Sequence, residues 1–380
     1  MAPNSLSQRL AAKRRSGDPI VDLTESNPTR VGIDYPGDLL GPLSDPRGLE
    51  YEPAPLGLGE ARLAVAADFL RRGFAVPADR ILLTASSSEA YGFLFKLLLD
   101  PGDAVLVPRP SYPLFEFLAR LESATLAFYD LDYDGEWHLS VEKLRARVTE
   151  RTRAICVVNP NNPTGSFLKQ DEAAALLRLC AERRLALISD EVFADYAFAD
   201  DPRRVASLAL HSDALVFCLG GLSKSCGLPQ LKLGWIAVSG PAAACQEALR
   251  VLEVIADTYL SVSTPVQRAA RDLLHRLPEL QGRIRDRVLA NLSLLRGRAH
   301  GSPATLLRAE GGWYGVLQVP NSVPEEQRVL RLLEEKGVLV HPGFFFDFPS
   351  EAYLVLSLLP PLAEFARGID AVLRDVGETA

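Results

Sequence analysis

The chain has 380 residues, enough for two domains or for one large and one small domain, and its formal net charge of −7 argues against a nucleic-acid-binding surface. Its five cysteines form no CxxC pair, and several lie in apolar runs, which indicates reduced thiols rather than a disulfide framework or a zinc site. Because no signal-peptide segment and no apolar run of transmembrane length occurs, we expect a cytoplasmic protein that binds no membrane.

The first 59 residues predict little regular structure. Residues 1–20 suggest a short helix, and a brief strand at 21–24 leads into a turn-rich loop. Residues 31–59 are dense in Gly and Pro and predict extended chain with one aromatic residue, Tyr51. The run Gly57-Leu58-Gly59 is not a dinucleotide-binding fingerprint, because no strand precedes it and Arg62 stands in place of the third glycine.

From Glu60 onward, helix-like and strand-like segments alternate. Helices are expected at 60–72, 88–99, 112–122, 171–183 and 243–256, and strands at 81–84, 104–107, 125–129, 154–158, 185–189, 215–219 and 233–238. Several of these strands are continuously apolar, which is typical of strands buried on both faces. The alternation predicts an α/β fold in which residues 41–270 form a large domain with a mostly parallel seven-stranded sheet flanked by helices.

The pattern changes after about residue 270. A long helical stretch rich in Arg and Leu, at 266–298, is followed by expected strands at 304–308, 313–319, 338–341 and 353–358 and by helices near 324–336 and 361–375. This predicts a smaller α+β domain at residues 271–380. Residues 1–40 are expected to join it, because the two segments flank the large domain in the sequence.

Lys224 lies in a loop of small residues between two strand-like runs, 215–219 and 233–238. The chain contains seven lysines against thirty-four arginines, so arginine is its usual source of positive charge. A lysine at this place therefore suggests a need for an amine that can lose its proton and attack a carbonyl group. On this stretch alone, a solvated loop lysine is an open alternative.

Two strand ends upstream predict groups that could hold a ligand. The strand at 81–84 leads into a serine turn at the start of a helix, where free N–H groups and hydroxyls form an anion site. Ser86 and Glu89 also have the spacing of a capping box. The following strand leads into Pro-Arg-Pro-Ser-Tyr-Pro, which places Tyr112 at the carboxyl edge of the sheet, where it could stack on a heteroaromatic ring. A plain capped helix and a packed loop aromatic remain open.

Two further strand ends carry an amide and a carboxylate. The run Asn-Pro-Asn-Asn-Pro-Thr-Gly at 159–165 predicts a rigid turn that can hold the amide of Asn162 toward a ligand oxygen. Asp190 closes the apolar strand at 185–189, and a carboxylate there needs a cationic partner or a hydrogen-bond network. A pyridinium N–H would serve, and the carboxylate would keep that ring an electron sink.

In this order, these segments resemble the class I/II aminotransferase family, which consists of fold-type I pyridoxal-phosphate enzymes similar to aspartate aminotransferase. The likeness covers about residues 20–360 and rests on Tyr51, the serine turn at 84–90, Pro110-Ser111-Tyr112, the run 159–165, Asp190-Glu191-Val192-Phe193, Ser223-Lys224 and Leu231-Lys232-Leu233-Gly234-Trp235. Several weak signals in the family's order outweigh the separate alternatives.

The resemblance implies that Lys224 binds pyridoxal 5'-phosphate as a Schiff base and later moves the substrate proton. It also implies that Asp190 pairs with the pyridine nitrogen, that Asn162 donates a hydrogen bond to the ring oxygen, and that Tyr112 stacks on the ring. The phosphate would be held by Ser86, Ser87, Ser88, Ser223 and Lys232. Tyr51 would reach the phosphate of the neighbouring subunit, so the active unit is expected to be a homodimer.

Three positions depart from the family pattern. The family usually has Tyr at the position of Phe193, which would still face the cofactor, and Arg at the position of Lys232. The family also has an arginine that grips the substrate α-carboxylate, and here Val355 occupies its position. These departures put the donor to the ring oxygen and the carboxylate clamp in doubt.

An arginine on a loop that borders the site could replace the missing clamp. Arg30 follows Glu25-Ser26-Asn27-Pro28, the loop that in the family lines the substrate pocket, and we favour Arg30 with Asn27 as substrate-binding residues. Arg109, three residues before Tyr112, is the second candidate, although its side chain could point away from the site. If both are surface arginines, amines or carboxylate-blocked donors become the better expectation.

The expected activity is transfer of an amino group between an amino acid and a 2-oxo acid. A lyase or decarboxylase on the same scaffold is an open alternative, because a fold does not determine its reaction. A catalytically idle pyridoxal-phosphate-binding regulator has less support, since no DNA-binding segment is appended and the residues around Lys224 are intact.

Overall fold

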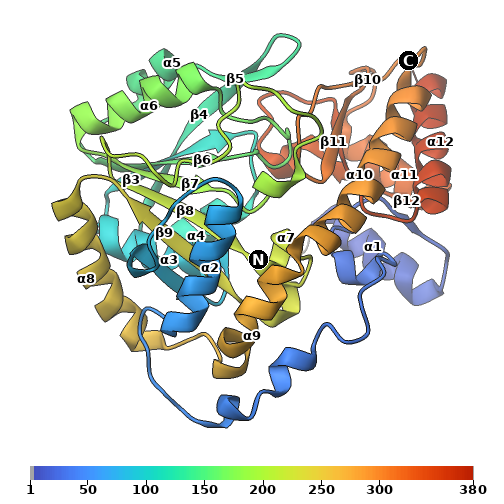
Figure 1. Ribbon diagram of the computed structural model, residues 1–380. Coiled ribbons are helices and arrows are strands. Elements are labelled where there is room, and N and C mark those ends of the chain that lie inside the picture. Colours follow the sequence, from blue (N-terminus) through green and yellow to red (C-terminus); the bar gives the residue numbers. More distant parts are fainter. Residues whose placement is uncertain (1–3, 380) are drawn as a thin grey trace.

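An eight-stranded sheet forms the centre of the molecule, in the spatial order β2-β9-β8-β7-β6-β3-β4-β5 (Figure 1). The computed structural model describes residues 4–379. The sheet strands are β2 (Ile81–Thr84), β3 (Ala104–Arg109), β4 (Thr125–Tyr133), β5 (Trp137–Leu139), β6 (Thr152–Val158), β7 (Ala186–Asp190), β8 (Val216–Gly221) and β9 (Gly234–Ser239). Neighbours from β8 to β4 run parallel, whereas β9 is antiparallel to β2 and β8, and β5 is antiparallel to β4.

Helices cover both faces of this sheet. One apolar core joins alternate strand residues to helices α2 (Gly59–Arg71), α5 (Val141–Arg147), α6 (Gln170–Arg183) and α9 (Thr264–His275). A second core joins the intervening strand residues to α3 (Ser87–Leu98), α4 (Leu114–Leu121) and α8 (Ala242–Tyr259). Every residue of β2, β7, β8 and β9 is buried, which is why these strands are continuously apolar in the sequence.

Both ends of the chain contribute to the smaller part of the molecule. Its antiparallel sheet has the order β10-β11-β14-β13, and a separate pair of parallel strands joins β1 to β12. The strands are β1 (Val21–Asp22), β10 (Thr305–Leu306), β11 (Tyr314–Gln318), β12 (Val338–Leu339), β13 (His341–Pro342) and β14 (Tyr353–Ser357). The helices are α1 (Ser5–Ser16), α10 (Leu277–Ala299), α11 (Glu325–Lys336) and α12 (Leu362–Glu378).

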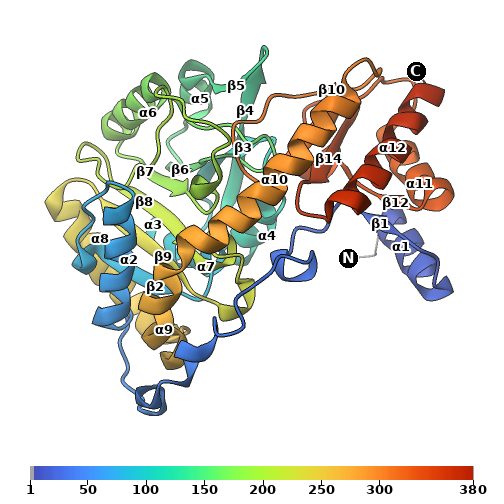
Figure 2. The same cartoon turned by 45° about the vertical axis from the view of Figure 1, so that its right-hand side comes forward.

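Helix α10 connects the two parts. It runs from α9, beside the large sheet, to the small antiparallel sheet (Figures 1 and 2). Its apolar residues reach into the core of the small part, where Ile284, Val288 and Leu295 are fully buried. The N-terminal segment passes in the opposite direction, from α1 along the lower side of the molecule to α2 (Figure 2). The chain therefore connects the large and small parts twice, once through α10 and once through the N-terminal segment.

The predicted α/β architecture is confirmed, with differences in detail. The sheet has an eighth strand, β5, because the chain after β4 turns back and pairs Tyr133 with Trp137. The helical stretch predicted at 266–298 is interrupted near Arg276, because Pro278 lacks an N–H group and begins a new helix instead of continuing the first. The short N-terminal helix is present as α1, but residues 1–3 of the predicted segment lie outside the described residues.

Within residues 4–379, no helix combines the length and apolar character needed to cross a bilayer. The same residues contain no group of three or more His, Cys, Asp or Glu side chains that could hold a metal ion.

Candidate active site

The strand pairing brings the predicted functional segments to one edge of the large sheet. In β6 and β7, Val158 pairs with Asp190, and Asp190 pairs in turn with Leu219 of β8. At the same edge, Gly234 of β9 lies between Gly221 of β8 and the end of β2. The serine turn, the turn at 159–165, Asp190 and the Lys224 loop therefore all leave the sheet together.

Lys224 lies in α7 (Leu222–Ser225), a single helical turn that directly follows β8. Its Nζ atom is 5.5 Å from the ring centroid of Phe193 and 5.2 Å from that of Trp313. Burial lowers the pKa of the Lys224 amine, and the attraction of the Asp190 carboxylate opposes this effect. The surroundings thus favour the neutral amine that a nucleophile requires.

The Asp190 carboxylate is fixed from both of its oxygens. Oδ2 accepts a hydrogen bond from the Tyr91 hydroxyl at 3.0 Å, and Oδ1 accepts one from the backbone N–H of Val192 at 3.2 Å. Burial raises the pKa of Asp190 to about 6, while the two hydrogen bonds and Lys224 lower it in part. A buried carboxylate of this kind would gain stability from a cationic N–H partner.

The turn at 159–165 is held rigidly beside Asp190. The backbone N–H of Asn159 donates to the Asp190 carbonyl at 2.8 Å, and the Asn161 amide donates to the Pro110 carbonyl at 3.0 Å. The Asn162 side chain is buried, and no group within residues 4–379 hydrogen-bonds to its Oδ1. Asn162 is thus a buried amide whose side-chain oxygen has no partner among these residues.

The serine turn ends β2 and starts α3. Ser86 caps this helix by accepting a hydrogen bond from the Glu89 N–H at 3.2 Å. The Glu89 carboxylate reaches back to the Ala85 N–H at 2.6 Å, one residue before the position that a capping box requires. Across from this turn, a Cβ on Gly234 would lie 3.2 Å from the Ser86 carbonyl carbon, so a side chain there would be tightly packed.

The remaining predicted cofactor residues differ in exposure. Half-buried positions are found for Ser87 and Ser88, in the first turn of α3, and for Ser223 in α7. Lys232 is exposed and has a left-handed backbone with φ of 53°. Tyr112 is 47% exposed at the end of the segment after β3. Tyr51 is 75% exposed on the extended segment before α2, where it lines a surface hollow together with Ser261 and Val262.

The two candidate arginines differ in their surroundings. The Arg109 side chain pairs with Asp130 at 2.7 Å and lies over the Phe128 ring, so its charge is already engaged. Arg30 is exposed, and no residue between 4 and 379 forms an ion pair with it. The loop that carries it packs beside the lysine loop, because Tyr35 donates to the Gly227 carbonyl at 2.8 Å. The side chain of Asn27 accepts from Thr29 and caps a short 3-10 helix.

Val355 is fully buried in β14, where it pairs with Val316 on one side and His341 on the other. His341 packs against the ring of Phe346, and burial lowers its pKa to about 4. None of Val355, Val316, His341 and Phe346 therefore carries a permanent positive charge that could pair with a substrate carboxylate.

Three functional contacts were not predicted from the sequence. Tyr91 donates to Asp190, Trp313 covers Lys224, and the Tyr196 hydroxyl donates to the Lys224 carbonyl at 2.8 Å. Only Trp313 has a visible signal, since it follows two glycines and precedes a strand. Tyr91 and Tyr196 are brought to the site by tertiary packing.

The residues at this edge fit pyridoxal phosphate. Lys224 supplies a desolvated amine, and the buried Asp190 lacks a cationic partner in hydrogen-bonding contact among the described residues. The side-chain NH2 group of Asn162 is a donor that suits a ring oxygen, and the first turn of α3 supplies donors for a phosphate. These are four separate functions that one phosphorylated pyridine aldehyde would use.

Known proteins resemble the chain over nearly its whole length. The sequence model of the family described as aminotransferase class I and II matches residues 48–358. Alanine aminotransferase of Mycobacterium tuberculosis is 28% identical over 380 residues, which cover 96% of this chain and 87% of that protein. Glutamate-pyruvate aminotransferase AlaA of Escherichia coli is 26% identical over 381 residues, with 94% and 92% covered.

Solved structures share the fold. An alanine aminotransferase from Pyrococcus furiosus superposes with a TM-score of 0.90 at 23% identity, covering 98% of this chain and 96% of that chain. A single mutant of Thermus thermophilus aspartate aminotransferase gives a TM-score of 0.85 at 24% identity, with 99% and 97% covered. With the family match over residues 48–358, the chain belongs to the class I and II aminotransferases, which are pyridoxal-phosphate-dependent transaminases.

Proposed function

We propose that this aminotransferase acts on an α-amino acid and a 2-oxo acid, with Lys224 as the residue that binds the cofactor and moves the proton. The relatives named above as alanine and glutamate-pyruvate aminotransferases support small amino acids as substrates. The observation that carries the proposal is the half-buried Lys224, whose amine has a pKa lowered by desolvation and which follows the sheet edge that carries Asp190.

Bound pyridoxal phosphate would supply an electron sink that stabilises negative charge at the substrate Cα. The chain's own residues would then position and protect it. Asp190 would hold the proton on the pyridine nitrogen, and Asn162 would donate to the ring oxygen. The first turn of α3, with Ser86, would bind the phosphate. Lys224, once free, would carry a proton to and from the Cα atom.

The substrate carboxylate requires a positive partner that Val355 does not provide. We favour Arg30, because its loop packs against the segment that follows Lys224 and its guanidinium has no ion-pair partner within residues 4–379. Asn27 would orient this loop through its hydrogen bonds to Thr29. Arg109 is disfavoured, because its ion pair with Asp130 would have to break first.

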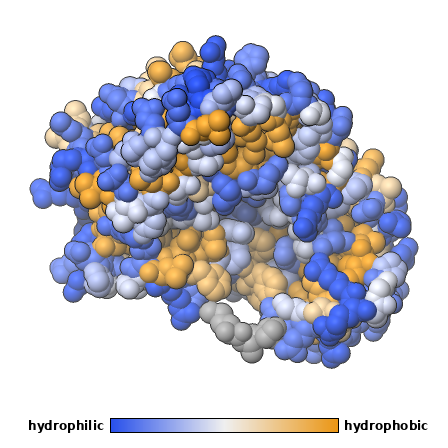
Figure 3. All heavy atoms as spheres, turned by 90° about the horizontal axis from the view of Figure 1, so that it is seen from below, coloured by the Kyte–Doolittle hydropathy of each residue, from blue (hydrophilic) through white to orange (hydrophobic). Residues whose placement is uncertain are grey.

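We also propose a cytoplasmic homodimer. The segment before α2 exposes Leu49 and Tyr51, and it lies on the lower face of the molecule (Figure 1). Seen from below, this face carries several apolar patches among polar side chains (Figure 3). A second copy would cover apolar residues of this kind and bring Tyr51 toward the partner's phosphate site.

The test is to incubate the protein with pyridoxal phosphate, reduce it with borohydride and map the labelled peptide. Label on the peptide containing Lys224 is expected, and label on another lysine would refute the assignment. Adding a panel of amino acids to the unreduced enzyme should then bleach the visible absorption and leave pyridoxamine phosphate. Release of ammonia or carbon dioxide instead would favour a lyase or decarboxylase.

The carboxylate clamp is tested by comparing Arg30→Ala with Arg109→Ala. Loss of a hydrogen bond between charged groups should weaken binding of the best amino donor by about tenfold or more in Arg30→Ala only. If Arg30→Ala keeps full apparent affinity, the clamp is elsewhere, and donors without a free carboxylate should be tried.

A further inference from the structure

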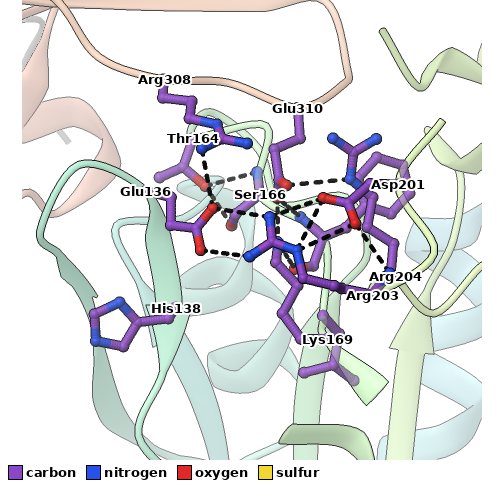
Figure 4. A network of polar contacts seen from close by, with 12 residues as sticks. Glu136, His138, Thr164, Ser166, Lys169, Asp201, Arg203, Arg204, Arg308 and Glu310 are labelled. Atoms are coloured by element: carbon purple, nitrogen blue, oxygen red, sulfur yellow. Dashed lines mark hydrogen bonds and ion pairs between the residues drawn. The ribbon is translucent and has the colours of Figure 1, made fainter. Parts of the chain in front are cut away.

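A buried carboxylate, Glu310, lies in the segment that joins β10 to β11 (Figure 4). Its Oε2 atom accepts from the Lys169 ammonium at 2.5 Å and from the Phe167 N–H at 3.0 Å, and its Oε1 accepts from Arg204 Nε at 3.1 Å. The side chains of Glu310, Lys169 and Arg204 are only 2%, 8% and 10% exposed. Three donors from the large part therefore converge on one carboxylate of the small part.

The backbone of Glu310 is held by the same neighbourhood. Its N–H donates to the Gly165 carbonyl at 3.1 Å, and its carbonyl accepts from the Phe198 N–H at 2.9 Å. Gly165 ends the turn that carries Asn162, and Phe198 follows the segment that carries Phe193. Glu310 thus contacts both segments that surround the proposed ring site.

Two glycines connect this anchor to Trp313. Gly311 has no space for a side chain, because a Cβ would lie 2.7 Å from the Phe167 ring and from the Tyr196 carbonyl. Gly312 donates to the Tyr196 carbonyl at 3.0 Å and has a φ of 83°, which side-chain-bearing residues rarely adopt. Trp313 follows at once, edge-on to Phe193 and with its ring over Lys224. The short link through Gly311 and Gly312 means that the position of Glu310 determines the direction of the Trp313 indole.

The outer part of this network differs from its centre. Glu136 pairs with Arg203 at 2.9 Å and with Arg308 at 3.1 Å, but both arginine side chains are half exposed (Figure 4). Hydrogen bonds from Arg203 hold the pKa of Glu136 below its usual value. Exposed ion pairs of this kind contribute little to structure, so the positioning depends on the buried centre.

We propose that Glu310 is a positioning residue of the active site, which fixes the Trp313 ring against Lys224 and the Asn162 turn beside the cofactor. The proposal rests on the function proposed for Lys224. Replacing the carboxylate leaves Lys169 and Arg204 buried without a counter-charge, and they would draw in water or turn outward. The 310–312 segment then keeps only its backbone hydrogen bonds, and the indole is held less firmly against Lys224.

The experiment uses the cofactor-free protein labelled with 5-fluorotryptophan, because the chain has only three tryptophans. Trp313→Phe assigns its fluorine resonance by loss of one signal. In Glu310→Gln, which keeps the side-chain shape, the Trp313 resonance should shift or broaden while those of Trp137 and Trp235 stay unchanged. The dissociation constant of pyridoxal phosphate should rise about tenfold, as expected for one lost hydrogen bond to a charged oxygen.

Glu136→Gln is the matched control, since it removes the same charge from the exposed part of the network, and its Trp313 resonance should not move. If Glu310→Gln does not fold, Glu310→Gln combined with Lys169→Met removes one of the two unpaired cations and should still displace the indole. An unmoved Trp313 resonance in the folded variant overturns the proposal. Failure of the wild-type enzyme to transfer amino groups would instead overturn the proposed function and leave the resonance comparison intact.

Discussion

At the scale of single residues, burial acts on Lys224 and Asp190 in opposite directions. It lowers the pKa of the lysine and raises that of the carboxyl, so in each case the uncharged form is favoured. A cofactor that reacts with the amine and offers a protonated ring nitrogen to the carboxylate would use both tendencies. The groups of the site are therefore less stable without the cofactor than with it.

The titration of Asp190 should be visible in the stability of the cofactor-free protein. Its folded pKa of about 6 lies above the ordinary value of 3.8, so the folded state binds the extra proton and loses stability as the pH rises through this interval. Relative to Asp190→Asn, the free energy of unfolding of the wild type should fall by up to about 3 kcal/mol across this interval.

Denaturant unfolding of the wild type and of Asp190→Asn, measured with and without pyridoxal phosphate, checks this. The loaded wild type should lack the loss, because a cationic ring nitrogen lowers the pKa of Asp190. Parallel pH profiles of the two cofactor-free proteins would contradict the assignment of this titration to Asp190.

Phe193 has no hydroxyl to donate to the ring oxygen of the cofactor. It is buried against Trp313 and lies 5.5 Å from the Lys224 amine. In Phe193→Tyr, a new donor should stabilise the anionic ring oxygen and lower the pH midpoint of the visible absorption by about one to two units. Phe348→Tyr makes the same change on a ring stacked against Tyr353, and its midpoint should stay at the wild-type value. A midpoint that is unchanged or raised in Phe193→Tyr would mean that this ring does not face the cofactor.

At the scale of elements, the site depends on the close approach of β8 and β9. In β8, Gly220 faces Trp235 of β9, and a Cβ there would lie 2.6 Å from the indole Cε2 atom and closer still to Nε1. This glycine is two residues before α7, so any displacement of Trp235 also disturbs the entry to the lysine turn. The strand needs the glycine for space, since its backbone conformation is ordinary.

Gly220→Ala should therefore destabilise the protein by about 1–3 kcal/mol through overpacking. Gly282→Ala in α10 is the control, because nothing within 4 Å would meet its new methyl group. That variant should gain up to about 1 kcal/mol from helix propensity. Chemical denaturation of both variants measures the difference, and equal stabilities would refute the packing argument.

The sequence predicts elements well where one local pattern decides them. Continuous apolar runs mark β2, β7, β8 and β9, and the segments that follow β2, β3, β6, β7 and β8 carry most of the predicted site residues. The sequence does not reveal β5, because the strand has only three residues, and its two buried ones, Trp137 and Leu139, are separated by the half-buried His138 and so form no apolar run. Contacts such as Tyr91 to Asp190 join residues 99 positions apart, and no local pattern encodes them. Glu310 was likewise missed, since a single glutamate in a loop gives no sign of burial.

At the scale of the whole molecule, we propose the division into a large domain at 41–270 and a small domain of 1–40 with 271–380. The pairing of β1 with β12 supports joining the two ends of the chain. The buried Arg328–Asp375 ion pair at 3.1 Å ties α11 to α12 within the small domain. Glu310 ties this domain to the turn at 159–165, so closure over a substrate has to use other segments, among them the loop of Arg30.

Assembly of two chains should depend on the exposed segment before α2, where Leu49 is 91% exposed. Leu49→Asp would place a charge in an apolar contact and should shift the sedimentation equilibrium from the two-chain mass toward the one-chain mass. Leu362→Asp, on an exposed position of α12, is the control and should leave the mass unchanged. A wild-type protein with the one-chain mass would refute the homodimer.

The pairing of β1 with β12 has a consequence for biosynthesis. Val21 leaves the ribosome early, but its partner Val338 is translated about 300 residues later. At typical elongation rates, the wait is on the order of 15–60 s. The whole large sheet lies between them and can fold during this interval, whereas the first strand stays without its partner. A nascent chain stalled before β12 should therefore contain a protease-resistant large domain and a cleavable N-terminal segment.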